Sequence, residues 1–254
     1  MDSLTLKQLK QIPWNTRYVS GPDIPPEPPL ADIARLVGIP FMKRPVKYAL
    51  FYSWSEAIKS VGVEPARVLD AACGRGIISQ ILLFKGHKVS ACDILDCFSA
   101  DKRIDFKRVD LNHEFPYEDD SFDVVINSEG LECLEGSEHF IKETARVLKN
   151  GGRLILSIPY IHSLVSRFNF LRSGLLAGYD AALLDRQNIL YLPFLKEFFK
   201  VVGFHIMVIK GNVPQLTLKS KVFNAVFGDL MFDTNNPVLR FSHSLIITAS
   251  IAKH

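Results

Sequence analysis

The sequence has no run of 18 uncharged apolar residues within its 254, so we expect no transmembrane helix. Residues 1–7 do not show the pattern of a signal peptide. Cysteine is scarce, with four residues, and no two of them have the C-x-x-C spacing typical of zinc sites. We therefore expect reduced thiols and a cytoplasmic location.

Several catalytic motifs are also missing. The sequence contains no P-loop and no H-E-x-x-H metalloprotease motif, and it shows no nucleophile triad. The hydrophobic content of 48% and the charged content of 22% are ordinary for a globular protein, and the length suits one full-sized core. The composition indicates a globular chain and leaves its chemistry open.

Charge is divided unevenly along the chain. Residues 1–150 carry a net charge of −3 and residues 151–254 a net charge of +6. A basic second half suits anionic substrates or an anionic membrane surface, and an ordinary solvated basic face explains it equally well.

The most informative stretch runs from Val68 to Gly76. Residues 67–72 are apolar and partly β-branched, which predicts a buried strand. An apolar run follows Gly76 and stops at Gly86, which predicts a helix. A strand, a glycine loop and a helix in this order form a ligand-binding turn at the end of a parallel strand.

Asp70 lies at the tip of this strand, four residues before Gly74. A dinucleotide site has G-x-G-x-x-G, but Ser79 takes the third glycine position here. A carboxylate in this place repels a phosphate and suits a ligand with an ammonium group. The alternative is that Asp70 caps the helix.

Two further acids follow predicted strands. Residues 87–93 end in Asp93, which lies 19 residues after Gly74, a spacing that suits a carboxylate on both hydroxyls of a ribose. The alternative is that Asp93 caps the next turn. Residues 104–110 form a third strand that ends in Asp110.

The rest of the chain alternates between the two kinds of element. We expect helices at residues 48–61, 137–149 and 192–204, and strands at residues 122–127, 153–159, 205–210 and 244–253.

Asp70-x-x-x-Gly74-x-Gly76 resembles motif I of the class I S-adenosylmethionine (SAM) methyltransferases. Residues 146–154, with the sequence RVLKNGGRL, resemble a second signature of the same family, and the resemblance covers residues 66–159. It implies an α/β fold with a Rossmann-like seven-stranded sheet, order 3-2-1-4-5-7-6, strand 7 antiparallel and helices on both faces. SAM is the implied cofactor. The positions implied to bind it are Asp70, Ala71, Gly74, Gly76, Asp93, Ile94, Asp110, Leu111 and Asn127.

Residues 128–133, SEGLEC, resemble the S-E-V-L-E-H segment of the ubiquinone-biosynthesis O-methyltransferases and of their relatives in surface-polysaccharide operons. In some members two glutamates and the histidine are thought to hold a divalent metal. Here Glu129 and Glu132 are present, but Cys133 replaces the histidine. A soft thiol beside two carboxylates is a poor magnesium site, so we predict no metal.

The resemblance also suggests a domain organisation. We expect residues 1–45 to form an N-terminal arm and residues 46–254 a single methyltransferase domain. Insertions at residues 160–190 and 212–240 should form the acceptor side. Their Phe and Leu content, mixed with basic residues, suits either an apolar acceptor pocket or peripheral contact with a membrane, and packing into the core explains it equally well.

The predicted activity is transfer of a methyl group to a small-molecule, glycan or lipid-like acceptor at oxygen. His162 is the leading candidate for a general base and Glu129 is the second. The alternatives are a nucleic-acid or protein methyltransferase and a non-catalytic SAM-fold subunit. No N-P-P-Y or D-P-P-Y follows the fourth strand, so we expect no nucleic acid partner. The oligomeric state is left open.

Overall fold

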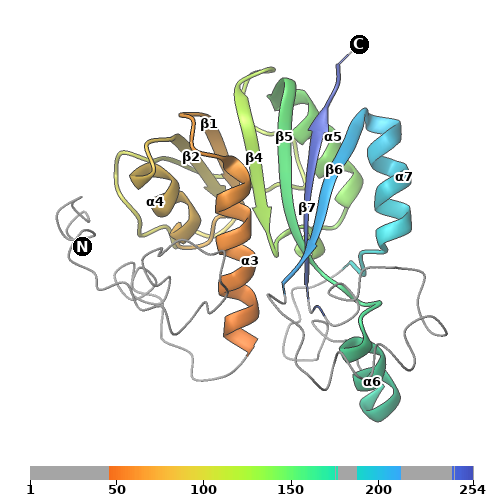
Figure 1. Ribbon diagram of the computed structural model, residues 1–254. Coiled ribbons are helices and arrows are strands. Elements are labelled where there is room, and N and C mark those ends of the chain that lie inside the picture. The colour runs from red at the N-terminus through yellow and green to blue at the C-terminus, as the bar shows by residue number, and fades with distance from the viewer. Residues whose placement is uncertain (1–45, 175, 177–187, 213–241, 243, 254) are drawn as a thin grey trace.

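The computed structural model describes residues 46–174, 176, 188–212, 242 and 244–253 (Figure 1). The strands in these residues are β1 Arg67–Ala71, β2 Lys88–Asp93, β3 Asp105–Arg108, β4 Phe122–Ser128, β5 Leu148–Pro159, β6 Phe204–Gly211 and β7 Ser244–Ile251. The helices are α3 Val46–Val61, α4 Ile77–Phe84, α5 Ser137–Val147, α6 Leu164–Ser173 and α7 Leu192–Val202, with a 3₁₀ turn η2 at Leu131–Cys133.

The strands form one sheet in the order β3-β2-β1-β4-β5-β7-β6. The pairs from β3 to β5 are parallel, and β7 runs antiparallel to both β5 and β6. The order and the antiparallel seventh strand that the resemblance implied are therefore confirmed. A reversal of strand order lies between β1 and β4, and this is where ligands of open α/β sheets bind.

Each central strand sends alternate side chains to opposite faces of the sheet. In β1, Val68 belongs to the apolar cluster under α3 and α4, whereas Leu69 belongs to the cluster under α5 and α7. Both residues are fully buried. Burial on both faces explains why these strands are almost continuously apolar, as parallel strands usually are.

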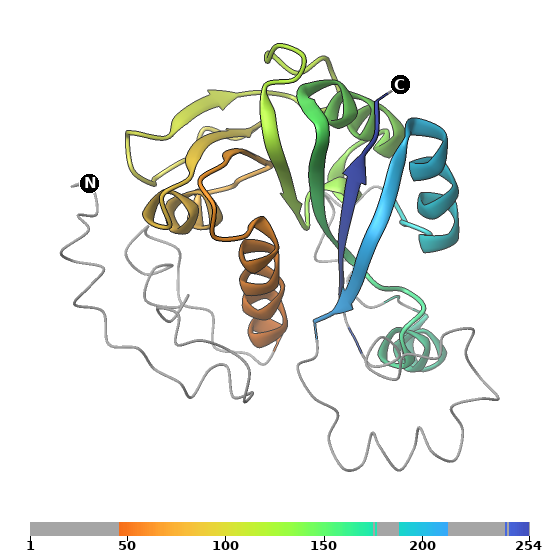
Figure 2. The same cartoon turned by 45° about the horizontal axis from the view of Figure 1, so that its top comes forward.

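Helices cover both faces of the sheet (Figure 2). Helices α3 and α4 lie on one face, where they contact β2, β4, β5 and β7, and α5 and α7 lie on the other face, where they contact each other, β5 and β6. On α5 the inward side is a stripe that includes Phe140 and Ile141, both fully buried. Burying a phenylalanine of this kind contributes about 1.5–3 kcal/mol.

Helix α5 is shorter than the sequence predicts. We expected it to reach residue 149, but it ends at Val147, and Leu148 already pairs with Phe122 in the sheet. Leu148 is fully buried, so pairing and burial at that position override continuation of the helix. The strand then passes through Asn150 and Gly151 before it pairs with Val124, and the register shifts there.

Strand β3 is also shorter than predicted, because it covers Asp105–Arg108 instead of residues 104–110. Asp110 therefore lies two residues beyond the strand. The backbone N–H of Val109 donates to the Asp93 carbonyl at 2.9 Å, so the chain still runs beside the end of β2 at that point.

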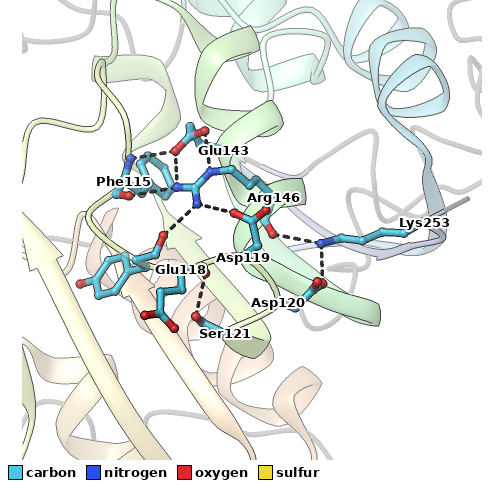
Figure 3. A network of polar contacts seen from close by, with 9 residues as sticks. Phe115, Glu118, Asp119, Asp120, Ser121, Glu143, Arg146 and Lys253 are labelled. Atoms are coloured by element: carbon cyan, nitrogen blue, oxygen red, sulfur yellow. Dashed lines mark hydrogen bonds and ion pairs between the residues drawn. The ribbon is translucent and has the colours of Figure 1, made fainter.

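Arg146 joins α5 to the connection between β3 and β4 (Figure 3). Its guanidinium donates to both carboxylate oxygens of Glu143 at 3.0 and 2.7 Å and to Asp119 Oδ1 at 2.8 Å. It also donates to the carbonyls of Phe115 and Tyr117 at 2.9 and 2.8 Å. All five N–H donors of the arginine are thus used. This network explains physically why an arginine stands at that position of the RVLK sequence.

The predicted N-terminal arm (residues 1–45) and almost all of the predicted insertion at 212–240 lie outside the described residues. Part of the insertion at 160–190 is described and contains α6, which lies beyond the end of β5 (Figure 1). Within the part of the chain that the structure describes, no helix is long and apolar enough to cross a membrane.

Candidate cofactor and acceptor site

The carboxyl ends of β1, β2 and β4 lie side by side. Ala71 pairs in register with Cys92 of β2 and with Asn127 of β4. The residues that follow these positions therefore meet at one edge of the sheet. Most of the positions predicted to bind a cofactor lie at or just beyond this edge.

The glycine loop after β1 turns through left-handed backbone conformations at Ala72, Gly74 and Gly76, with φ of 61°, 53° and 82°. A Cβ added to Gly74 would meet no atom within 4 Å, so the loop is open on that side. A Cβ on Gly76 would lie only 2.3 Å from the Phe98 ring. The first glycine leaves room for a ligand, and the second leaves room for a neighbouring side chain.

Asp70 is buried beneath this loop. Its Oδ2 accepts the backbone N–H of Ser79 at 3.0 Å and the Ser79 hydroxyl at 2.5 Å. Because Ser79 lies in the first turn of α4, Asp70 caps that helix from a neighbouring strand. The capping alternative raised by the sequence is therefore observed, and contact with the amino group of a ligand stays a prediction.

Burial raises the pKa of the Asp70 carboxyl to about 6, although the two Ser79 bonds lower it, and the charge of Asp93 raises it further. Burial also raises the pKa of the neighbouring Cys73 and Cys92 thiols, in the case of Cys92 to about 12. These thiols are therefore protonated at neutral pH and are not poised as nucleophiles.

Asp93, at the end of β2, is held by two backbone groups. Its Oδ2 accepts the N–H of Gly74 at 2.8 Å, and its Oδ1 accepts the N–H of Leu95 at 2.9 Å. A carboxylate has about four lone-pair positions, so each oxygen can accept one further hydrogen bond. The glycine loop thus orients a carboxylate that can still bind two hydroxyl groups.

Ile94, next to Asp93, exposes 51% of its surface. Its carbonyl accepts Arg108 Nε at 2.9 Å, which ties the turn to β3. Asp110 accepts the N–H of Asn112 at 3.0 Å and lies 3.3 Å from His113 Nδ1, while Leu111 is buried. The structure thus places an exposed apolar side chain and two acids along the β2 and β3 side of the edge.

Asn127 bridges β4 and β1. Its Nδ2 donates to the Ala71 carbonyl at 3.1 Å, at the point where the strand order reverses. The residue is fully buried. This side chain holds the two strand ends together. It therefore has a structural role whether or not it also contacts a cofactor.

Glu129 follows β4 with a left-handed backbone, φ 55°, which is uncommon for a residue with a side chain. Its Oε1 accepts the Ser157 hydroxyl at 3.4 Å, and the Ser128 and Ser157 hydroxyls are 3.0 Å apart. Glu132 is fully buried in η2, and Cys133 is half-buried. In the described residues no three His, Cys, Asp or Glu side chains are grouped as a metal site would require.

His162 lies in the turn between β5 and α6, between two tyrosine rings. The ring centroids are 5.8 Å from Tyr160 and 5.0 Å from Tyr191. Tyr160 is buried, and Tyr191, at the start of α7, is half-exposed. The N–H of Asn188 donates to the Glu132 carbonyl at 2.9 Å, which joins the segment before α7 to η2. These elements lie at the edge beyond β4 and β5.

Comparison with known proteins supports this arrangement. Residues 69–156 match the family model of a methyltransferase domain. The described core has the fold of a class I methyltransferase, and residues 69–156 are similar to a methyltransferase domain.

Named relatives are similar over part of their length. A probable SAM-dependent methyltransferase of Mycobacterium tuberculosis is 34% identical over 96 residues, which are 36% of this chain and 35% of the relative. A ubiquinone biosynthesis O-methyltransferase of Xanthomonas oryzae is 31% identical over 140 residues, 52% of this chain and 57% of the relative. The matches thus span about a third to somewhat more than half of these relatives.

Solved structures share the fold at low identity. One belongs to the complex between the Haloferax volcanii Trm112 methyltransferase activator and its putative methyltransferase, with a TM-score of 0.59, 19% identity and coverage of 81% of this chain and 91% of that one. Another is a Burkholderia thailandensis 1,6-didemethyltoxoflavin-N1-methyltransferase with bound S-adenosylhomocysteine, with a TM-score of 0.54, 16% identity and coverage of 81% and 79%.

Some residues of this candidate site were not found from the sequence. Ser79 was noted only as a missing glycine, yet it is the partner of Asp70. Gly130 was not singled out, although a Cβ there would lie 2.7 Å from Ala72 Cβ. Both lie close in sequence to candidate site residues. A serine after the glycine loop and a glycine after β4 could therefore have been recognised as part of the site. Phe98 had no such signal, because its contact with Gly76 depends on how two loops meet.

Proposed function

We propose that this chain is a SAM-dependent methyltransferase that methylates a hydroxyl of a small-molecule, glycan or lipid-like acceptor. The observation that carries the proposal is the Asp93 carboxylate. Two backbone N–H groups hold it at the end of β2, beside the open side of the glycine loop. The matching family model and the named relatives support the same activity.

The residues present fit SAM. Asp93 has lone pairs for two ribose hydroxyls, and the exposed Ile94 offers an apolar surface for the adenine. Asp70 and Asp93 place negative charge beside the loop, which suits an ammonium group and disfavours a pyrophosphate. The open space at Gly74 lets the ligand approach the backbone.

Methyl transfer from SAM needs no covalent intermediate with the protein. Bound SAM supplies a methyl group on a positively charged sulfur, and that charge disappears as the methyl leaves. The protein orients the acceptor oxygen in line and removes its proton. The general base that accepts this proton is His162, whose imidazole lies between the rings of Tyr160 and Tyr191. Glu129 is the second candidate.

A hydroxyl acceptor is supported by the similarity to a ubiquinone biosynthesis O-methyltransferase. A lipid-like acceptor, with peripheral contact at a membrane, is supported by α6. Phe168, Phe170 and Leu171 of this helix are exposed, and so are Arg167 and Arg172. Exposed apolar side chains beside basic ones suit a membrane surface with anionic lipids.

Calorimetry on the wild-type chain tests the proposal. Titration with S-adenosylhomocysteine, the product form of the cofactor, should give a saturable one-site signal. NAD is the matched competitor, because it carries ribose and adenine together with a pyrophosphate. Tight NAD binding without a signal from S-adenosylhomocysteine would overturn the proposed function.

A further inference from the structure

The loop after β2 closes onto the glycine loop through a single aromatic ring. The Phe98 ring occupies the space beside Gly76, where an added Cβ would lie 2.3 Å from Cε2 and 2.9 Å from Cδ2. The methyl group of Ala100 lies against the same glycine, with an expected separation of 2.9 Å from that Cβ. The glycine loop therefore fits against this loop only because Gly76 has no side chain.

The ring is itself held in place from the other side. Phe98 stacks on Phe106 of β3, with centroids 4.7 Å apart and ring planes 10° from parallel. Both rings pack against the apolar cluster under α3 and α4. Phe98 thus connects the sheet edge at β3 to the glycine loop after β1.

Backbone bonds join the glycine loop to the end of β2 and to the loop that follows it. The N–H of Ser99 donates to the Arg75 carbonyl at 3.3 Å, and the N–H of Cys73 donates to the Cys92 carbonyl at 3.0 Å. Between these two bonds, the N–H of Gly74 donates to Asp93 Oδ2. Asp93 therefore accepts a hydrogen bond from the same glycine loop that packs against Phe98.

We propose that Phe98 is a positioning residue for the cofactor site. It acts through Gly76 and Gly74 on the carboxylate of Asp93, and the inference rests on the proposed function of that site. Without the ring, the glycine loop has more conformations, and the cofactor has to order it on binding. We expect Phe98→Ala to weaken binding of S-adenosylhomocysteine by about tenfold or more, because loop ordering is then included in the binding free energy.

The experiment is calorimetry with S-adenosylhomocysteine on the wild type, Phe98→Ala, Phe98→Leu and a matched control, at a temperature where all variants are folded. Phe84→Ala is the control, because Phe84 is also half-buried against the same cluster but lies at the opposite end of α4 from Gly76. It should lower the melting temperature and leave the affinity unchanged. Phe98→Leu should keep most of the affinity, since a branched side chain still fills part of the space.

A double-mutant cycle separates positioning from general stability. Gly76→Ala introduces a methyl group that collides with the ring, and its left-handed backbone adds strain. In the Phe98→Ala background the collision with the ring is removed, and only the close approach to Ala100 and the backbone strain remain, so the fold loss in affinity from Gly76→Ala should be smaller than in the wild type. Additive losses, or equal losses from Phe98→Ala and Phe84→Ala, would overturn the inference. If the wild type itself bound no S-adenosylhomocysteine, that result would contradict the proposed function, on which this inference rests.

Discussion

Asp70 accepts two hydrogen bonds from Ser79, one from its backbone N–H and one from its hydroxyl, and all of these groups are buried. The helix cap and the candidate cofactor site thus share one carboxylate. Its protonation state should therefore affect both the stability of the fold and the affinity for a ligand.

The stability effect has a definite sign. The pKa of Asp70 is about 6 in the folded protein and near its ordinary value of 3.8 when unfolded. The folded state therefore binds the extra proton between these values, and the contribution of Asp70 to stability falls as pH rises from about 4 to about 6. Asp70→Asn removes this dependence. Compared with the wild type, it should gain about 2–3 kcal/mol between pH 4 and pH 7.

Urea unfolding of both proteins at several pH values measures this difference. Comparing the two proteins cancels the opposite contribution of carboxyls such as Glu143, whose pKa is lowered by hydrogen bonds from Arg146. A difference that stays constant with pH would contradict the prediction. Asp70→Asn should also weaken binding of S-adenosylhomocysteine, which has an ammonium group, and not that of a pyrophosphate ligand.

Asp93 is expected to hold the ribose of the cofactor. Asp93→Ala should weaken binding of S-adenosylhomocysteine by at least about tenfold, because hydrogen bonds to a charged group contribute roughly 1.5–3 kcal/mol each. Asp93→Asn should be milder, since an amide oxygen still accepts one bond. Calorimetry gives the three dissociation constants. Equal affinities for all three proteins would show that Asp93 does not bind the cofactor.

We expect that no metal is required, because Cys133 replaces the histidine of the related segment beside Glu129 and Glu132. Once an acceptor is found, methyl transfer should survive exhaustive dialysis against EDTA. The matched variant is Cys133→His, which completes the metal-binding pattern of the relatives and should not raise activity in the metal-free protein. Loss of activity on dialysis, restored by magnesium or zinc, would show that the prediction is wrong.

Arg146 should be important for stability but not for the cofactor site. Arg146→Met removes the guanidinium from Glu143, which keeps only the N–H of Phe115, and from the carbonyls of Phe115 and Tyr117, so we expect a loss of about 2–4 kcal/mol in the free energy of unfolding. The lysine variant should recover only part of it, because an ammonium group cannot form the paired bonds of a guanidinium. Denaturant unfolding measures the loss. A change in S-adenosylhomocysteine affinity in the folded variants would contradict the structural role.

The exposed apolar residues of α6 are expected to contact a membrane surface. In vesicle flotation at low salt, the wild type should float with vesicles containing anionic lipid and not with neutral ones. Leu171→Ser should reduce the floating fraction, because Leu171 has 82% of its surface exposed on α6. Val63→Ser, at an exposed position outside α6, is the matched control. Absence of flotation with the anionic vesicles would rule out this contact.

Much of the fold could be predicted from local patterns. The apolar run before Gly74, the glycine loop and the helix after it are contiguous, so periodicity and glycine placement indicate them directly. The strand order was also correct, but it came from the resemblance of the chain to a family. The end of α5 was placed two residues too late, because the pairing of Leu148 with Phe122 is a tertiary contact.

The sequence by itself determined which residues stand at the ends of the strands, since Asp70, Asp93 and Asn127 each follow an apolar run. Only the tertiary structure decided what those residues touch. Asp70 caps α4 through Ser79, Asn127 donates a hydrogen bond to Ala71 of β1, and Phe98 packs against Gly76. Each of these contacts joins segments that are 9 to 56 residues apart. Such contacts depend on how the strands pair and how the loops pack, and a local sequence pattern does not specify strand pairing or loop packing.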